Sequence, residues 1–436
     1  MKIFIFFLFI SLFFSSNSYF TMPFYTEKIS DNTTEENFIL NYMNTGLYSK
    51  IKIGSNSQEL PVLINLISYE SYIINSTVNY NGPKYNIKES SSYIEGKRLN
   101  FFMNDIIKYG SKSYDLFDLG EIKIQNFTFT LASSFQNNSL IREGGQIGLG
   151  VINLHTSGDD SFIRQLNDLK IIKHYPFSIA YTKEDEGNLI FGEYLHDIKK
   201  YQYNKEDMMT IQLVDIDNEF FWTVSSKFKV DNNTMDFYQG FIINSQYGFN
   251  FAYSEYSTYI SPFLKDKISD GKCKEKGIYI EGIFPDLFNE QNYYYYVCDE
   301  DVDLKNFPSL IVEIEGNKFQ IEFTYKDLWV KFKGKNYLNV LLNNYIEASS
   351  GFYFSFGRMF LKKYDLTFDT ERRIIGIYNK KKITKTNWKL LTIVVFIILI
   401  VILFFLFRFI FRYYQMKNSK KTAHELTEDG FYQLSD

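Results

Sequence analysis

Histidine and cysteine are scarce in this 436-residue chain, which contains four of the first and two of the second. The four histidines are too widely scattered to provide the ligand spacing of a metal site. They are His155, His174, His196 and His424. We therefore expect no metal and no other cofactor. With two cysteines, the chain can form at most one internal disulfide.

An excess of either charge is also missing. The formal net charge is −4 at pH 7 and 19% of the residues are aromatic, which suits a globular chain rather than one that binds phosphate backbones. The glycine-rich stretch 144–150 (GGQIGLG) lacks the lysine and the helix start of a phosphate-binding loop, so we read it as the end of a strand. Neither nucleic acid nor a nucleotide is an expected partner.

Segments with a helical repeat are few, and 161–170 is the best of them. Short runs with alternating apolar residues, rich in β-branched and aromatic side chains, predict strands instead. These runs are 48–54, 60–66, 71–76, 121–133, 177–182, 188–194, 210–216, 221–230, 310–316, 318–325, 364–370 and 373–379. The pattern predicts an all-β domain. Because the chain is longer than a single core normally supports, we expect two lobes.

The first 18 residues have the layout of a secretory signal peptide. Lys2 precedes an apolar run, 3–14, and small residues follow at 15–18, where cleavage would fall. An uncleaved N-terminal anchor is the alternative, although the apolar run is short for one. We predict an exported protein.

A second apolar run, 390–407, carries no charge and is about long enough to cross a ~30 Å hydrocarbon core as a helix. With the signal peptide it predicts a single-pass type I membrane protein of the secretory pathway or cell surface, with a cytosolic tail, 408–436. Both flanks of the span are basic, so the predicted orientation depends mainly on the signal peptide.

Export to an oxidising compartment allows Cys273 and Cys298 to form a disulfide, the alternative being two unrelated thiols. N-glycosylation also takes place in the secretory pathway, and the sequence contains five sequons, each of which predicts a surface position. They begin at Asn32, Asn75, Asn126, Asn137 and Asn232.

One pattern occurs twice. An apolar strand runs into Asn65 in the first half and into Asn244 in the second, and each half later has an apolar run with glycine, GQIGLG at 145–150 and FSFGRMF at 354–360. Such a repeat predicts two related lobes that bring the two asparagines face to face.

These segments resemble the pepsin family of aspartic peptidases. The I-x-I-G-x-x-x-Q-x-x-x-V-x-x-D-T-G-S segment of the family is matched without a gap and preceded by a tyrosine. The matching residues are Tyr48, Ile51, Ile53, Gly54, Gln58, Val62, Asn65 and Ser68. The segment 351–379 resembles the family's C-terminal strands, GQIGLG resembles its GILGL segment, and Tyr109 with the two residues that follow resembles the tip of its flap hairpin.

The resemblance covers about Tyr48 to Asn379. It implies a bilobal pepsin-like fold with an interlobe cleft in a domain of residues 19–387, with an N-lobe of about 47–205 and a C-lobe of about 206–380. The pair Cys273 and Cys298 lies where the family commonly closes a loop in its second lobe.

The chain departs from the family at the catalytic positions. The two D-T-G triplets read Asn65-Leu66-Ile67 and Asn244-Ser245-Gln246. The family mechanism needs two carboxylates that share a proton, and a primary amide has no useful acid–base equilibrium near neutral pH. Only Ser245 keeps a hydroxyl of the kind that braces the family's loops. We expect a hydrogen-bonded pair of asparagines that holds the lobes together without catalysis.

Three functions follow as hypotheses. The first is a membrane-anchored pseudo-peptidase that binds a peptide or protein through its cleft or lobe surface. The second is an atypical aspartic endopeptidase acting in proteolysis, and the third is a surface glycoprotein that uses the fold as a stable body.

Overall fold

The computed structural model describes most of the chain between residues 19 and 416. The described ranges are 19–103, 107–135, 143–152, 161–214, 221–231, 233–280, 292–314, 316, 319–343, 352–380, 396–397 and 399–416. The predicted signal peptide, most of the predicted tail and the sequons at Asn137 and Asn232 lie outside these ranges. The chain forms two units, one ending at Lys380 and one starting at Lys381, and each is described by itself.

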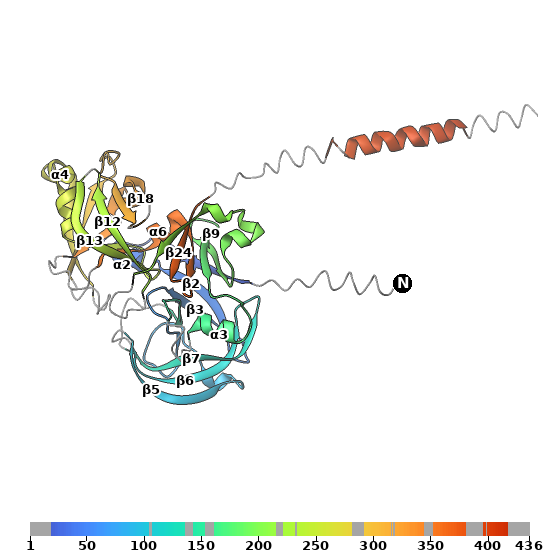
Figure 1. The fold of residues 1–436 in the computed structure, drawn as a ribbon, viewed down its shortest axis with the longest axis horizontal. Coiled ribbons are helices and arrows are strands. Elements are labelled where there is room, and N and C mark those ends of the chain that lie inside the picture. The colour runs from blue at the N-terminus through green and yellow to red at the C-terminus, as the bar shows by residue number, and fades with distance from the viewer. Residues whose placement is uncertain are drawn as a thin grey trace, which may run out of the picture. The chain divides into compact units, whose positions relative to one another are not determined.

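The first unit is built on two large sheets, which confirms the all-β prediction. The larger sheet contains 13 strands, in the order β11 (Met208–Gln212), β24 (Ile374–Asn379), β23 (Tyr364–Asp369), β9 (Phe177–Tyr181), β10 (Glu186–Phe191), β1 (Phe20–Thr26), β2 (Leu47–Ile53), β3 (Gln58–Asn65), β8 (Gly145–Gly148), β4 (Tyr72–Ile74), β7 (Lys123–Phe135), β6 (Ile107–Asp118) and β5 (Ile94–Met103). Figure 1 shows β5, β6 and β7 curving around the far end of this lobe.

The second sheet contains 11 strands. Its order is β18 (Gln320–Phe323), β17 (Leu310–Ile314), β12 (Thr223–Val230), β13 (Asn233–Ile243), β22 (Phe352–Phe356), β14 (Asn250–Tyr253), β21 (Val340–Asn343), β16 (Asn292–Asp299), β20 (Lys335–Leu338) and β19 (Trp329–Phe332), with β15 (Cys273–Tyr279) paired to β16. The disulfide Cys273–Cys298 forms as predicted, and its two residues lie directly opposite each other on β15 and β16.

Helices are short and lie between the strands. The described α-helices are α2 (Glu35–Met43), α3 (Phe162–Asp168), α4 (Glu255–Ser269), α5 (Tyr325–Leu328) and α6 (Arg358–Lys363), and the 3-10 helices are η1 (Ile87–Glu89), η2 (Leu195–Asp197), η3 (Lys199–Tyr201) and η4 (Lys205–Asp207). The helix predicted at 161–170 is therefore present as α3, while α2 and α4 were not predicted.

The internal repeat is real in three dimensions. In the first half, β3 runs parallel to β8 and ends at Asn65, opposite Gly148. In the second half, β13 runs parallel to β22 and ends one residue before Asn244, and the Asn244 backbone N–H donates to the carbonyl of Phe356 at 2.8 Å. The two asparagines thus lie at the C-terminal ends of equivalent strands of the two lobes: Asn65 is the last residue of β3, and Asn244 comes directly after β13.

One sheet extends across the predicted lobe boundary at 205/206. The strands β11, β23 and β24 come after residue 206, yet they belong to the same sheet as β9 and β10 of the first half. The N-terminal strand β1 also enters this sheet, by pairing with β10 and β2. The N-terminal strand β1 and the C-terminal strands β23 and β24 therefore belong to one sheet that contains strands from both halves. Dividing the sequence at one position does not show this sheet.

Aromatic packing connects the second half to this shared sheet. The Trp222 ring packs on Phe368 and Phe177, with centroid distances of 4.9 and 5.8 Å. Its indole N–H donates to the carbonyl of Leu149 at 2.8 Å. Burying a side chain of this size contributes a large share of apolar stabilisation while its polar atom stays hydrogen-bonded.

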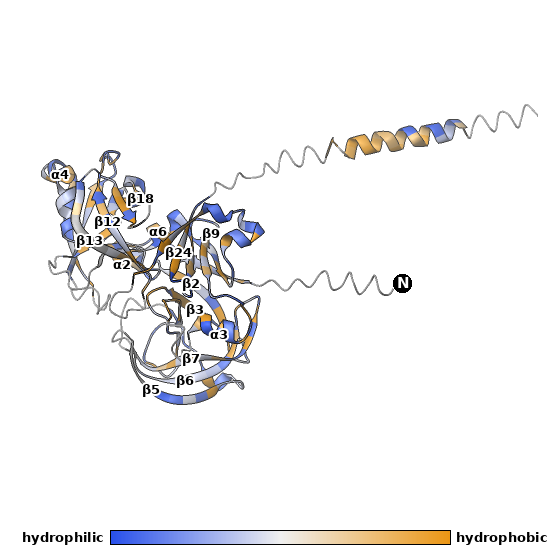
Figure 2. Ribbon diagram, viewed as in Figure 1, coloured by the Kyte–Doolittle hydropathy of each residue, from blue (hydrophilic) through white to orange (hydrophobic). Residues whose placement is uncertain are grey.

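The second unit contains one described helix that is long and apolar enough to cross a membrane. The helix window Leu399–Met416 has a mean hydropathy of 1.7. Figure 2 shows the apolar colour over most of this helix and polar colour toward its C-terminal end. The predicted span 390–407 overlaps it, but residues 390–395 and 398 lie outside the described part, and the described helix continues past Phe407 to Met416.

Candidate functional site

The first asparagine loop begins at the end of β3. Asn65 is 1% exposed, and its amide is engaged at both ends. Its Oδ1 accepts the backbone N–H of Ile67 at 2.9 Å, and its Nδ2 donates to Gln146 Oε1 at 2.8 Å. Gln146 in turn donates to the carbonyl of Glu70 at 3.1 Å. An amide suits this position because it donates and accepts at the same time.

The second loop repeats half of this arrangement. Asn244 is also 1% exposed, and its Oδ1 accepts the backbone N–H of Gln246 at 2.8 Å. The Nδ2 of Asn244, in contrast, is buried without a hydrogen-bond partner among the described residues. A buried donor of this kind is uncommon, because buried polar groups are nearly always paired. This amide is therefore the less satisfied of the two.

Ser245 connects the two loops. Its hydroxyl accepts the backbone N–H of Leu66 at 3.0 Å and donates to the carbonyl of Ile64 at 2.5 Å. Its carbonyl also accepts the N–H of Leu47 at 2.8 Å. Ser245 is 1% exposed, so these bonds are shielded from water. The sequence prediction that this hydroxyl is kept as a brace fits the geometry.

The expected hydrogen bond between the asparagines is not formed. Asn65 Nδ2 donates to Gln146 and Asn244 Nδ2 has no described partner, so the lobes are joined here by Ser245 rather than by an asparagine pair. Sequence reasoning missed Gln146. The signal was available, because Gln146 is a polar residue where the GILGL segment has isoleucine.

Leu66 and Ile67 stand where threonine and glycine would be, and both are buried, at 0% and 7% exposure. They pack into the core and offer no polar side chain to the site. Ser68 follows them, and its hydroxyl accepts the N–H of Glu70 at 3.2 Å. The first loop is therefore apolar at the two positions next to Asn65.

One buried carboxylate, Glu143, two residues before β8, acts electrostatically on residues near both loops. Glu143 is 5% exposed. Burial raises the pKa of Tyr72 in the first half and of Tyr247 in the second, and the charge of Glu143 raises both further. Glu143 thus acts on tyrosines from both halves of the domain, one of them three residues after Asn244.

Comparison with known proteins agrees with this geometry. A family model described as eukaryotic aspartyl protease matches residues 46–380. The chain belongs to the eukaryotic aspartyl protease family. The match spans both asparagine loops and every described strand of the two sheets except β1.

Two curated proteins show weaker similarity. Calretinin of Gallus gallus is 24% identical over 168 residues, 38% of this chain and 59% of that protein. Calretinin of Bos taurus is 26% identical over 170 residues, with the same shares. The chain thus spans about 59% of the length of these relatives, at an identity too low to show a shared family.

In this aspartyl protease domain, the described residues contain no group of three or more His, Cys, Asp or Glu that could hold a metal ion.

Tyr109 differs from its predicted place in the flap of the aspartyl protease domain. In the β5–β6 hairpin, Met103 pairs with Ile107, and residues 104–106 between them lie outside the described residues. Tyr109 lies within β6, paired with Asn100, and its side chain is 58% exposed. It therefore belongs to the second strand of the hairpin and not to its tip.

The described sequons differ in exposure. Asn32 and Asn126 are exposed, as predicted for glycosylation sites. Asn75 is only 7% exposed, and its Oδ1 accepts the backbone N–H of Thr77 at 3.2 Å. The prediction of a surface position is wrong for Asn75, because this side chain caps a turn against the end of β4.

Proposed function

We propose that this member of the aspartyl protease family is a catalytically inactive, membrane-anchored protein that binds a peptide or protein through its cleft or lobe surface. One observation carries the proposal. Asn65 and Asn244 occupy equivalent ends of β3 and β13, where the family has its catalytic carboxylates. A general base must take a proton from water, and neither amide can do so.

Binding is supported by the second amide. Asn244 Nδ2 is a buried donor without a described partner, next to the bond between Ser245 and Leu66. A peptide carbonyl is the natural acceptor for such a donor, and leaving it unpaired costs about 1–3 kcal/mol. Under this proposal, a bound peptide carbonyl would pair with this donor, in a site without the groups that would cleave the peptide.

The test is peptide capture by the full-length chain, immobilised in detergent and incubated with a random peptide library. We expect retained, uncleaved peptides, and reduced retention by Asn244→Leu, which removes the donor. Asn56→Leu is a matched control on an exposed turn. A chain that retains no peptides, or that retains them equally after Asn244→Leu, would favour a surface body that uses the fold only as a scaffold.

A second candidate function is an atypical endopeptidase, and Glu143 is the observation in its favour. This buried carboxylate acts on Tyr247, which follows the Asn244 loop. A lone carboxylate lacks the partner that protonates the substrate, so the rate would be low. If the chain cleaves peptides, Glu143→Gln should abolish the cleavage under this alternative.

We also propose a type I orientation and N-glycosylation at Asn32 and Asn126. Protease added outside sealed microsomes should remove only the segment after Arg408, and an epitope at Asp436 should be lost. Endoglycosidase should then shift the protected fragment, and Asn32→Gln with Asn126→Gln should reduce that shift. Protection of the C-terminal epitope would show the opposite orientation.

A further inference from the structure

The strand β15 forms a free edge of the second sheet. It pairs with β16 along its whole length, from Cys273 opposite Cys298 to Tyr279 opposite Asn292, without a register shift. No other described strand pairs with it. The edge strands β11, β18 and β19 are only five, four and four residues long, and the longer edge strand β5 has two irregularities in its pairing. Among the described strands, β15 is therefore the longest regular edge.

The antiparallel ladder shows which backbone groups of β15 are free. The Asp299 N–H donates to the Lys272 carbonyl at 2.9 Å, so this pair, just before the strand, is hydrogen-bonded. Hydrogen-bonded and non-hydrogen-bonded pairs alternate along such a ladder, so every second residue from Cys273 turns its N–H and C=O groups away from β16. These residues include Glu275, Gly277 and Tyr279. No backbone group of the described chain bonds to them on that side, and an open edge of this kind is a template for another strand.

One face of this edge carries positive charge. Lys274 and Lys276 are exposed and share a face, since successive side chains of a strand alternate. Neither forms an ion pair with a described residue. The carboxylate of Asp299 is already held by Lys335 at 2.5 Å, which lowers its pKa more than the charge of Lys274 does. The described residues therefore leave the charge of Lys274 and Lys276 without a direct counterpart.

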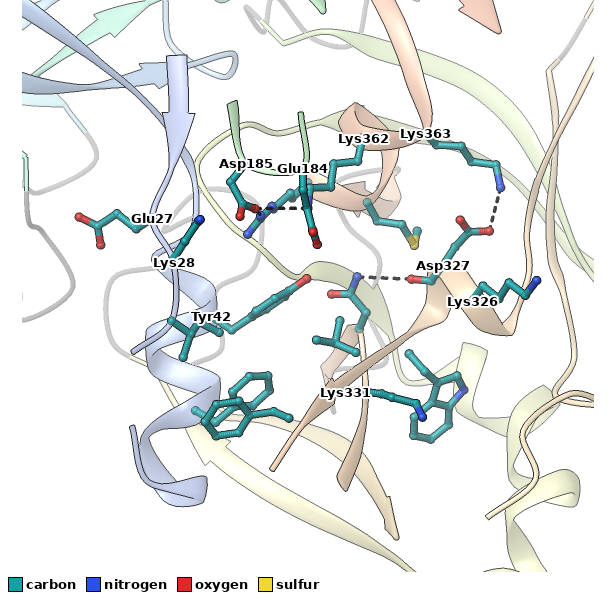
Figure 3. A pocket seen from close by; sticks show the side chains of 18 of the residues that line it. Glu27, Lys28, Tyr42, Glu184, Asp185, Lys326, Asp327, Lys331, Lys362 and Lys363 are labelled. Atoms are coloured by element: carbon teal, nitrogen blue, oxygen red, sulfur yellow. Dashed lines mark hydrogen bonds and ion pairs between the residues drawn. The ribbon is translucent and has the colours of Figure 1, made fainter. Parts of the chain in front are cut away.

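The charged groups of the cavity of about 550 Å³ beside α2 are arranged differently. Figure 3 shows its lysines close to carboxylates of the same domain. Lys363 donates to Asp327 at 2.7 Å, and Lys362 Nζ lies 3.6 Å from Asp185 Oδ1. These two cations are thus paired from within the domain, and the two exposed lysines of β15 are not.

The opposite face of β15 has a hollow at Gly277. A depression of about 470 Å³ is lined by Glu275, by residues 277–279 and by the start of β16. A Cβ at Gly277 would have its nearest neighbour 3.9 Å away. Tyr279 beside it is 60% exposed, more than any other large apolar side chain described in the first unit. A glycine in an edge strand leaves a space that an aromatic side chain of a neighbouring strand fills, so this face fits such a side chain.

A second copy of β15 does not suit this edge. A two-fold axis normal to the sheet would keep like faces on one side, so the four lysines of the two copies would gather on one face. Like charges on neighbouring strands are destabilising. The edge instead fits a strand of another protein that carries the opposite charge on that face.

We propose that β15 binds an extended segment of a partner protein, which adds to the sheet as an antiparallel strand and carries two acidic side chains at alternate positions. The acidic side chains lie opposite Lys274 and Lys276, and an aromatic side chain of the segment covers Gly277. In such strand addition the backbone hydrogen bonds give affinity and the alternate side chains give specificity. Read along an antiparallel strand, the segment is aromatic-acidic-x-acidic, with x opposite Glu275. The surface does not depend on the asparagine loops, so it stands whether or not the cleft binds a ligand.

The test uses the full-length chain in detergent and the peptide fluorescein-Thr-Val-Phe-Glu-Thr-Glu-Gly-amide, with binding followed by fluorescence anisotropy. We expect binding that weakens roughly fivefold or more when both glutamates are replaced by glutamine, because two cross-strand ion pairs are lost. Equal affinities of the two peptides, or no binding of the glutamate peptide, would overturn the proposal.

N-methylation separates strand addition from simple attraction between charges. Methylation of the phenylalanine nitrogen removes the N–H that donates to the Gly277 carbonyl, so binding should fall roughly tenfold or more. Methylation of the next nitrogen, that of the first glutamate, is the matched control, because this N–H points away from β15 and the affinity should stay within about twofold. Equal losses from the two changes, or no loss from either, would show attraction of an anion without strand pairing and overturn the proposal.

Variants of the chain locate the site. Lys274→Gln together with Lys276→Gln should weaken the glutamate peptide roughly fivefold or more and leave the glutamine peptide nearly unchanged. The matched control, Lys173→Gln together with Lys199→Gln at exposed positions of the first half, should change neither. Equal effects of the two double variants would overturn the proposal. So would loss of binding in Asn244→Leu alone, which would place the peptide in the cleft.

Discussion

The hydroxyl of Ser245 accepts the backbone N–H of Leu66 at 3.0 Å across the boundary between the two halves of the domain. The same hydroxyl donates to the carbonyl of Ile64, so one side chain fixes the backbone on both sides of Asn65. Leu66, at the equivalent position of the first loop, has no hydroxyl and cannot form the corresponding hydrogen bonds to the second loop. Ser245 therefore provides the side-chain hydrogen bonds between the two loops. The stability of both loops therefore depends on Ser245.

Replacing Ser245 with alanine should destabilise the domain. It leaves the buried N–H of Leu66 and carbonyl of Ile64 without their partner, at a cost of about 1–3 kcal/mol. Urea unfolding followed by tryptophan fluorescence measures the loss. The control is Ser269→Ala at the exposed end of α4, where the hydroxyl bonds to the carbonyl of Lys265 and a change below about 0.5 kcal/mol is expected. Equal losses in the two variants would show that Ser245 is not a brace.

Replacing Gly148, which packs against the backbone that follows the first asparagine loop, should destabilise the domain. A Cβ at Gly148 would lie 2.4 Å from the carbonyl carbon of Tyr69 and 2.5 Å from Glu70 N, both backbone atoms that cannot move freely. Gly148→Ala should cost about 1–3 kcal/mol or more, as overpacking does. At Gly277 on β15, a Cβ would meet its nearest atom at 3.9 Å, so Gly277→Ala serves as the control. A thermal midpoint that is unchanged in Gly148→Ala would contradict the close packing.

Restoring the carboxylates should affect the two loops differently. In the unmodified chain, Asn65 Nδ2 donates to Gln146 Oε1 at 2.8 Å. Asn65→Asp replaces this donor with a carboxylate oxygen, so two acceptors face each other. We expect the free energy of unfolding at pH 7 to fall by about 1–3 kcal/mol. Asn244→Asp replaces a donor without a described partner and should cost less. The double variant should regain little peptidase activity, since Leu66 and Ile67 provide no polar support. Strong, pepstatin-sensitive cleavage by the double variant would show that the surrounding site is intact.

Asp365 on β23 provides a prediction about pH. Burial raises its pKa, although Lys380 Nζ lies 3.8 Å from Oδ1 and the Tyr203 hydroxyl donates to Oδ2 at 2.8 Å. A folded pKa above the unfolded one means that stability is fully present below the unfolded pKa and is lost as pH rises through the folded pKa. Asp365→Asn mimics the protonated form, so its stability relative to the unmodified protein should rise across this window. A constant difference from pH 3 to 7 would contradict the shift.

Much of the fold could be predicted from local patterns. The alternation in 221–230 and 373–379 appears as β12 and β24, because period-two burial needs only neighbouring residues. Helix α4 was missed, since its segment contains Pro262 and many aromatic and hydroxyl residues. Its buried stripe, Tyr256, Ile260 and Leu264, repeats every four residues and was the available signal.

The site was predictable in its residues and less so in its contacts. The sequence repeat correctly located Asn65 and Asn244 at the ends of equivalent strands. In each half the asparagine-bearing strand pairs in parallel with a later apolar strand, β3 with β8 and β13 with β22. Their hydrogen-bond partners depend on side-chain packing between segments about 80 residues apart in sequence, as for Asn65 and Gln146. That information is tertiary, which is why an asparagine pair was expected and a brace through Ser245 was found.

The most direct test of the central claim is a peptide-library digest by the unmodified full-length chain between pH 3 and 7, read by mass spectrometry, with and without pepstatin. Each proton transfer by a general acid or base contributes about 10²- to 10⁴-fold to a rate, so a chain with two amides in place of the dyad should give no cleavage above the background of the buffer. Cleavage that pepstatin suppresses, and that survives Asn65→Leu or Asn244→Leu only at a reduced rate, would contradict the account.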